Sequence, residues 1–114
     1  AAAAAASTST IAKSTNLQLV TQSNDADDRI YLPSPTDVPL GHILFIVDSE
    51  GGGFELSSKG DGTTATTING TAVTNAAGAY SKELAIGANV MAIAVKIGAN
   101  AWSVGTLTNS APNA

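Results

Sequence analysis

The sequence predicts an all-β fold, a small antiparallel β-sandwich or barrel of about eight short strands with an extended N-terminal arm. Apolar residues alternate with a period of two in the longest apolar segments, which is typical of strands. Turn-forming Gly, Asn and Pro residues recur roughly every ten residues, as they do between the short strands of sandwiches and barrels. No window carries the i, i+3, i+4 apolar stripe of an amphipathic helix.

The clearest strand candidate is the segment 42–48, HILFIVD, whose two sides are both apolar, so we expect it in the centre of a sheet. The segment 89–97 alternates in the same way. Every second residue from Met91 to Ile97 is expected on one side of a strand, and every second residue from Val90 to Lys96 on the other. The segment 33–41 contains three prolines and indicates a rigid loop. Shorter candidate strands are 17–21, 29–33, 54–58, 66–69, 80–86 and 101–105.

The length of 114 residues suits a single domain with flanking segments. Residues 1–16 are small and polar with almost no apolar anchors, which indicates an extended N-terminal arm. We expect the β domain to occupy residues 17–106 and a polar C-terminal tail to occupy residues 107–114.

Composition argues against several classes of partner. Only 12% of the residues are charged, and the net charge is −4, whereas nucleic-acid binding needs clustered Lys and Arg. The most apolar segment, 87–102, is too short to cross a bilayer and contains Lys96. No cysteine is present, which excludes disulfides, thiolate metal sites and a cysteine nucleophile. We therefore expect neither a nucleic acid nor a membrane as a partner.

The segment 59–70, KGDGTTATTING, contains the Gly-x-Gly-x-x-Ala spacing of a dinucleotide-binding loop, beginning at Gly60. Glu83 follows about twenty positions later, where such a site has its ribose-binding carboxylate. That loop binds phosphate only between a buried strand and the first turn of a helix. The Thr-rich sequence after the glycines predicts no helix, so we expect a turn and no bound cofactor.

Two further groups of residues raise the question of metal binding or catalysis. Asp25, Asp27 and Asp28 could form a weak surface cation site, but Arg29 stands where an EF-hand loop needs Asp or Asn, which favours a β-turn. His42 is the only histidine, and no Gly-x-Ser-x-Gly motif accompanies it, which favours a surface position at a strand end over a catalytic base. We expect neither a bound metal nor an enzyme.

Two other features have a structural and a functional interpretation. Asn69-Gly70-Thr71 has the form of a glycosylation sequon, but Asn-Gly also favours a type I′ hairpin turn, and the turn is the preferred interpretation. Trp102 could stack on a sugar or a base. In a chain with only 4% aromatic residues, a role as an anchor of the core is favoured.

Taken in order, several motifs resemble a small β-module of tailed-bacteriophage virion proteins. These motifs are Leu32-Pro33, Gly41, the apolar strand 43–47, the glycines 51–53, Ile68-Asn69-Gly70, the strand 90–97 and Trp102. The resemblance covers roughly residues 17–105. It implies a non-enzymatic, usually trimeric, all-β building block of the kind found in tail fibres, receptor-binding proteins and capsid decoration (cement) proteins, and it transfers no catalytic residue.

The resemblance leads us to expect a decoration protein on the outer capsid surface of the virion, where a homotrimer binds the major capsid protein. The arm residues expected to contact the capsid are Ser7, Thr8, Thr10, Ile11 and Lys13. The residues expected between copies, on strand faces that a single chain leaves partly exposed, are Leu44, Ile46, Val90, Ala92 and Ala94. The alternative is a receptor-binding tail-fibre or baseplate module that recognises host glycans, which exposed aromatic residues at one end would favour.

Overall fold

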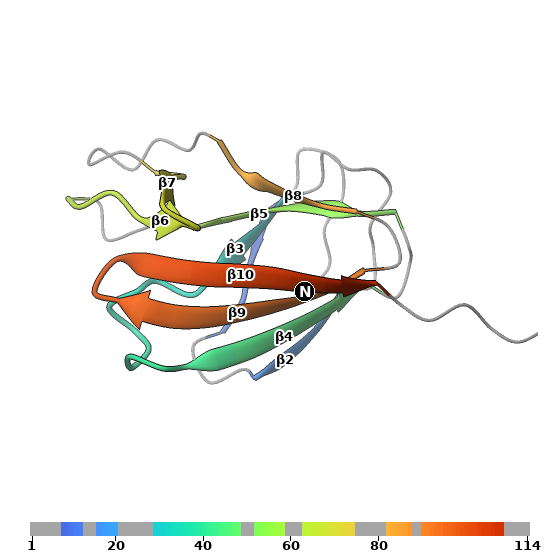
Figure 1. Ribbon diagram of the computed structural model, residues 1–114, viewed down its shortest axis with the longest axis horizontal. Helices are drawn as coiled ribbons and strands as arrows, with labels where there is room; N and C mark the ends of the chain where they lie inside the picture. The colour runs from blue at the N-terminus through green and yellow to red at the C-terminus, as the bar shows by residue number, and fades with distance from the viewer. Residues whose placement is uncertain are drawn as a thin grey trace, which may run out of the picture.

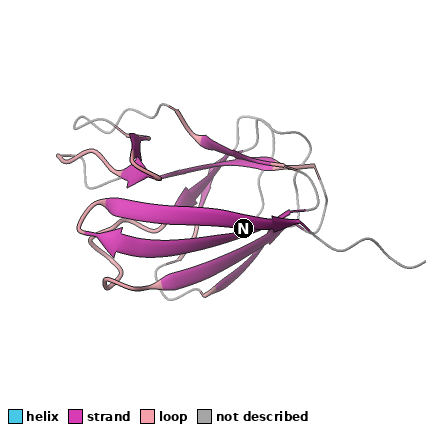
Figure 2. Cartoon of the chain, in the orientation of Figure 1, coloured by secondary structure: helices cyan, strands magenta, loops and turns pink. Residues whose placement is uncertain are grey.

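The computed structural model is all-β, as predicted, and none of the residues that it describes lies in a helix (Figures 1 and 2). It describes residues 8–12, 16–20, 29–48, 52–58, 63–74, 82–87 and 90–108. Their strands are β1 (Thr8–Thr10), β2 (Leu17–Val20), β3 (Arg29–Leu32), β4 (Ile43–Asp48), β5 (Phe54–Ser58), β6 (Thr67–Ile68), β7 (Thr71–Ala72), β8 (Leu84–Ile86), β9 (Val90–Gly98) and β10 (Ala101–Thr108).

The strands form two sheets that face each other like the layers of a sandwich and do not close into a barrel (Figure 1). The smaller sheet has four strands in the order β1-β3-β5-β8. The larger sheet has six strands in the order β2-β4-β9-β10-β6-β7, and its long strands β9 and β10 lie side by side in Figure 1.

Both sheets are mixed, which corrects the prediction of an antiparallel domain. From β1 to β5 the chain changes sheet at every connection, so that β1, β3 and β5 lie in one sheet and β2 and β4 in the other. Two successive reversals restore the strand direction, and the pairs β1–β3, β3–β5 and β2–β4 are therefore parallel. Side chains alternate with the same period in parallel and antiparallel strands, so the sequence pattern does not distinguish them.

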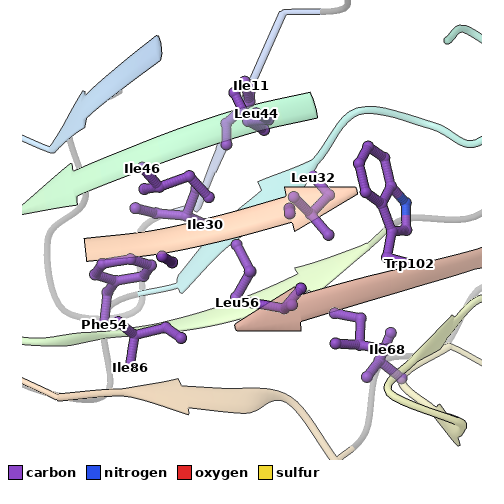
Figure 3. Packing of buried hydrophobic residues seen from close by; sticks show 14 of the residues in the cluster. Ile11, Ile30, Leu32, Leu44, Ile46, Phe54, Leu56, Ile68, Ile86 and Trp102 are labelled. Carbon is purple, nitrogen blue, oxygen red and sulfur yellow. The ribbon is translucent and has the colours of Figure 1, made fainter. Parts of the chain in front are cut away.

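The core lies between the two sheets, and Figure 3 shows side chains from both layers that point into it. Leu44 and Ile46 of β4, together with Phe54 and Leu56 of β5, have no exposed surface. Trp102 is also completely buried, which confirms its predicted role as a core anchor. Full burial of each such side chain contributes about 1.5–3 kcal/mol, so these residues hold the two layers together.

The proline-rich segment 33–41 forms a loop without strand or helix, as predicted, and Lys96 fastens it to the larger sheet. The Lys96 side chain lies on the inward side of β9 and is only 8% exposed. Its Nζ donates hydrogen bonds to the carbonyl oxygens of Pro35 and, at 2.7 Å, Val38. A buried ammonium group is costly unless it is hydrogen-bonded, and these carbonyls supply its acceptors.

The Asn69-Gly70 turn joins β6 to β7, and the predicted type I′ geometry is confirmed. The backbone φ angles are 53° at Asn69 and 81° at Gly70, both positive as this turn requires. Glycine adopts such an angle without steric cost, and asparagine tolerates it better than most residues.

The domain extends beyond its predicted limits at both ends. Strand β1 lies within the predicted arm 1–16, yet it pairs in parallel with β3. The next residue, Ile11, is 1% exposed, and its N–H donates to the Tyr31 carbonyl at 2.9 Å. At the other end β10 continues to Thr108, so the limit expected after residue 106 falls inside a strand.

Candidate interaction surface

The outward side of the larger sheet is apolar. In β4, Ile43 and Phe45 are 45% and 39% exposed, whereas Leu44 and Ile46 between and beyond them are buried. Strand β9 alternates in the same way. We call the outward side of β2, β4, β9 and β10 the outer face. Its residues are Leu17, Leu19, Ile43, Phe45, Val47, Met91, Ile93, Val95, Ile97, Ser103, Gly105 and Leu107.

The strand register makes the outer face continuous. One row across the four strands consists of Leu17, Phe45, Ile93 and Gly105. The neighbouring row consists of Leu19, Val47, Met91 and Leu107. Opposed residues on adjacent strands have Cβ atoms about 4.5–5.5 Å apart, so the side chains of each row lie next to one another, except at Gly105, which has none.

The two outward sides of the sandwich differ in charge. None of the described residues of the outer face is charged. On the smaller sheet Arg29 lies opposite Glu55, and the Arg29 Nε lies 2.7 Å from the Glu83 Oε1. The hydrogen bond with Tyr31, and then the nearby Glu83 carboxylate, raise the pKa of Arg29. The smaller sheet thus carries charged groups on its outward side, where Tyr31 and Ser57 are buried. A solvated sheet face is ordinarily polar, and the exposed outer face departs from that rule.

The structure corrects the residues expected between copies. Leu44, Ile46, Ala92 and Ala94 have no exposed surface and lie in the core of the single chain, while Val90 is partly buried against that core. Leu44 lies opposite Ala94 and Ile46 lies opposite Ala92, so a large residue fills the space beside each small one. The side of β4 and β9 that remains open to a partner is the opposite one, which carries Ile43 and Phe45.

The residues expected to contact a capsid lie in different environments in the structure. Thr8 and Thr10 belong to β1 and pair with β3 through the backbone. Ile11 is a core residue of the domain, which corrects its assignment to an exposed binding arm. Ser7 and Lys13 lie outside the described residues.

The residues considered for chemistry form no site in the part of the chain that the structure describes. Gly60, Gly62 and the aspartates at 25, 27 and 28 lie outside this part. The residues after the glycines lead into the strand β6 rather than a helix. His42 is half-buried beside β4, and no group of three or more acidic or histidine side chains gathers among the described residues in a way that could hold a metal ion.

No protein-family model, curated protein or solved structure matches this chain significantly. Within the described ranges, no helix has the length and apolar character needed to cross a membrane. The resemblance to a phage β-module therefore remains a prediction from the sequence. The fold and the surface together define an all-β sandwich with one polar and one apolar outward side.

Proposed function

We propose that this chain is a structural protein that assembles with copies of itself through the outer face. The observation that carries the proposal is the exposure of six large apolar side chains, 39% to 65% each, on one uncharged surface. These residues are Leu17, Leu19, Ile43, Phe45, Ile97 and Leu107. Covering them removes apolar surface from water, which is the dominant driving force of protein association.

The size of the outer face supports an interface. Side chains of this kind have a surface on the order of 200 Å², so the six together expose about 600 Å². The largest apolar patch of a typical monomer is about 300–600 Å² and is often functional. A standard interface covers about 800 Å² on each partner, which the half-buried residues of the outer face bring within reach.

The composition of the outer face favours a second copy of the chain as the partner. Interfaces between proteins that also exist separately are about as polar as the rest of the surface, whereas interfaces in homo-oligomers are more apolar. Charged side chains, which provide selective pairing between different proteins, are absent from the described residues of this face. An apolar sheet face packs well against another apolar surface, as the two layers of a sandwich show, and a second copy of the chain can supply such a surface.

The specific role that we propose is capsid decoration, in which a homotrimer binds the major capsid protein on the outer surface of a phage head. The order of motifs from Leu32-Pro33 to Trp102, which resembles virion β-modules, supports this role. The low content of charged residues, 12%, also suits a protein that associates through shape and apolar contacts. No catalytic function forms part of the proposal.

Recognition of host glycans by a tail fibre receives less support. A cluster of exposed aromatic rings would favour such a module, yet Tyr31 is 3% exposed, Trp102 has no exposed surface, and Phe45, which is 39% exposed, is the one aromatic residue of the outer face. Tyr80 lies outside the described residues. We therefore propose no second function.

Capsid decoration is tested by adding the purified protein to phage heads that lack it and by locating it with electron microscopy. The proposal predicts density on the outer surface of the head, with three copies at each site. Density at the tail tip, or heads that remain bare, contradicts the proposed role.

The contribution of the N-terminal segment is tested with two shortened chains. Deletion of residues 1–7 leaves β1 and Ile11 in place, and we expect it to weaken binding to heads without unfolding the domain. Deletion of residues 1–16 also removes β1 and Ile11 and is expected to destabilise the domain itself. Unchanged binding by the shorter deletion would remove residues 1–7 from the proposed capsid contact.

A further inference from the structure

We propose that the outer face contains a socket at Gly105 that receives the Phe45 side chain of a neighbouring copy of this chain. The inference rests on the assembly proposed above and goes further by naming the contact. It assigns different roles to two residues that lie in one row of the outer face, on either side of Ile93.

Gly105 is not explained by the structure of the single chain. It lies inside β10, where a glycine weakens a strand because it has no side chain to pack. Its φ is not positive, and an added Cβ would meet no other atom within 4 Å. Neither backbone conformation nor crowding within the chain therefore requires glycine at this position. Glycine in a strand is also found where another chain approaches closely.

The neighbours of Gly105 give the socket its walls. Ile93 lies directly opposite on β9. Ser103 and Leu107 precede and follow Gly105 on the same side of β10, and Leu107 is 55% exposed. Because Gly105 has no side chain and a Cβ added there would meet no atom within 4 Å, we infer that a partner side chain can enter the space between these neighbours.

Phe45 is the aromatic side chain of the outer face and the projection best suited to this space. It is 39% exposed in the single chain and lies on β4, opposite Ile93. A buried aromatic side chain contributes about 150–250 Å² of contact surface, more than any other side chain available on this face. Large aromatic groups that fill a pocket at the centre of an interface commonly dominate its binding energy.

The positions of the two residues limit how the copies can be arranged. Phe45 and Gly105 lie on different strands of the same sheet, so the contact joins β4 of one copy to β10 of the next. In a two-fold pair both copies would make this contact reciprocally, whereas repeated in one direction it closes into a ring or continues as a filament. A closed ring of three copies agrees with the trimer proposed above.

Introduced cysteines test this contact directly, since the chain has none of its own. Two strands apart in one sheet, residues 45 and 105 have Cα atoms about 9–10 Å from each other. Cysteines separated by more than about 7 Å cannot form a disulfide, so Phe45→Cys with Gly105→Cys in one chain cannot cross-link internally. Under mild oxidation we expect this double variant to form a covalent trimer, separated on a non-reducing gel.

The matched control combines Phe45→Cys with Ala85→Cys, because Ala85 is exposed on the smaller sheet. We expect the double variant to cross-link about ten-fold faster than this control, since thiols in contact have a high effective concentration. Phe45→Cys alone should remain monomeric on the gel. The proposed contact is wrong if the double variant and the control cross-link at equal rates. It is also wrong if Phe45→Cys alone forms a covalent dimer as fast as the double variant cross-links.

A second measurement does not depend on disulfide formation. Gly105→Val fills the socket, and we expect the concentration at which the oligomer dissociates to rise about ten-fold or more. Ala85→Val adds the same side chain on the opposite side of the domain and should leave that concentration unchanged. If the unmodified protein and Gly105→Val dissociate at the same concentration, the proposed socket is wrong, although the proposed assembly is not contradicted. If the unmodified protein is monomeric, the proposed assembly itself is wrong.

Discussion

The side chain of Asn69 pairs with the backbone of Val104 through two hydrogen bonds. Its Nδ2 donates to the Val104 carbonyl at 3.0 Å, and its Oδ1 accepts from the Val104 N–H at 2.8 Å. Strand β6 has only two residues and pairs with β10 at Ala101 and Trp102. The amide of Asn69 therefore continues the pairing of β10 beyond the end of its neighbouring strand.

Replacement of Asn69 by alanine should destabilise the domain. The change removes both bonds to Val104 and places alanine at a φ of 53°. We expect the free energy of unfolding to fall by about 2–3 kcal/mol in chemical denaturation. Thr71→Ala is the control, because it also removes the sequon but leaves the amide in place, and it should change stability by less than about 0.5 kcal/mol. Equal losses from the two variants would refute a role for the amide.

Lys96→Met should release the proline-rich loop from the sheet. Methionine preserves much of the apolar stem, but it removes the donor to the carbonyls of Pro35 and Val38. We expect a loss of about 2–3 kcal/mol in the free energy of unfolding, since a hydrogen bond from a charged group is lost inside the protein. The exposed Lys82 provides a control as Lys82→Met, which should be nearly neutral. A neutral Lys96→Met would show that the loop does not depend on this ammonium group.

Larger side chains should destabilise the folded chain on the inward side of the larger sheet but not on its outward side. Ala94→Leu adds volume to a completely buried position, and overpacking of this kind costs about 1–3 kcal/mol. Ser103→Leu adds volume on the outer face, where Ser103 is exposed, and should not destabilise the folded chain. Thermal unfolding of both variants tests the assignment of inward and outward sides. A stable Ala94→Leu combined with an unstable Ser103→Leu would reverse it.

Ile11 should contribute to stability as a core residue rather than as part of a free arm. Ile11→Ala removes a side chain that is 1% exposed, for which the expected cost is about 2–4 kcal/mol. The neighbouring Ala12 is exposed, so Ala12→Ser should change the unfolding free energy by less than about 0.5 kcal/mol. If both variants unfold at the same denaturant concentration as the unmodified protein, β1 does not hold this segment in the domain.

Local chemistry made several elements predictable. The alternation in 89–97 and the Asn69-Gly70 pair anticipated β9 and the hairpin turn, because side-chain period and positive φ are properties of the local sequence. The parallel pairing of β1, β3 and β5 was not predictable in this way, because it depends on how the chain crosses between sheets. Strand β1 itself consists of Thr and Ser and has no apolar pattern.

The sequence predicted which strands form the candidate interaction surface, but not which side of those strands faces outward. Segment 42–48 is apolar on both sides, so its pattern alone does not decide whether Leu44 or Phe45 faces the core. The choice depends on the opposing sheet, whose residues Phe54 and Leu56 pack in the same core as Leu44. One available signal was Gly105, a glycine between Val104 and Thr106 inside β10 that local turn chemistry does not explain.

The mass of the protein in solution tests the central claim, that copies of the chain cover the outer face. Light scattering at micromolar concentration should give three times the chain mass of 11.3 kDa. Ile93→Lys places a charge between Phe45 and Gly105 on the outer face and should give a folded species of single-chain mass. Ala85→Lys places the same charge on the smaller sheet and should keep the trimer. A single-chain mass for the unmodified protein, or a trimer that Ile93→Lys leaves intact, would contradict the account.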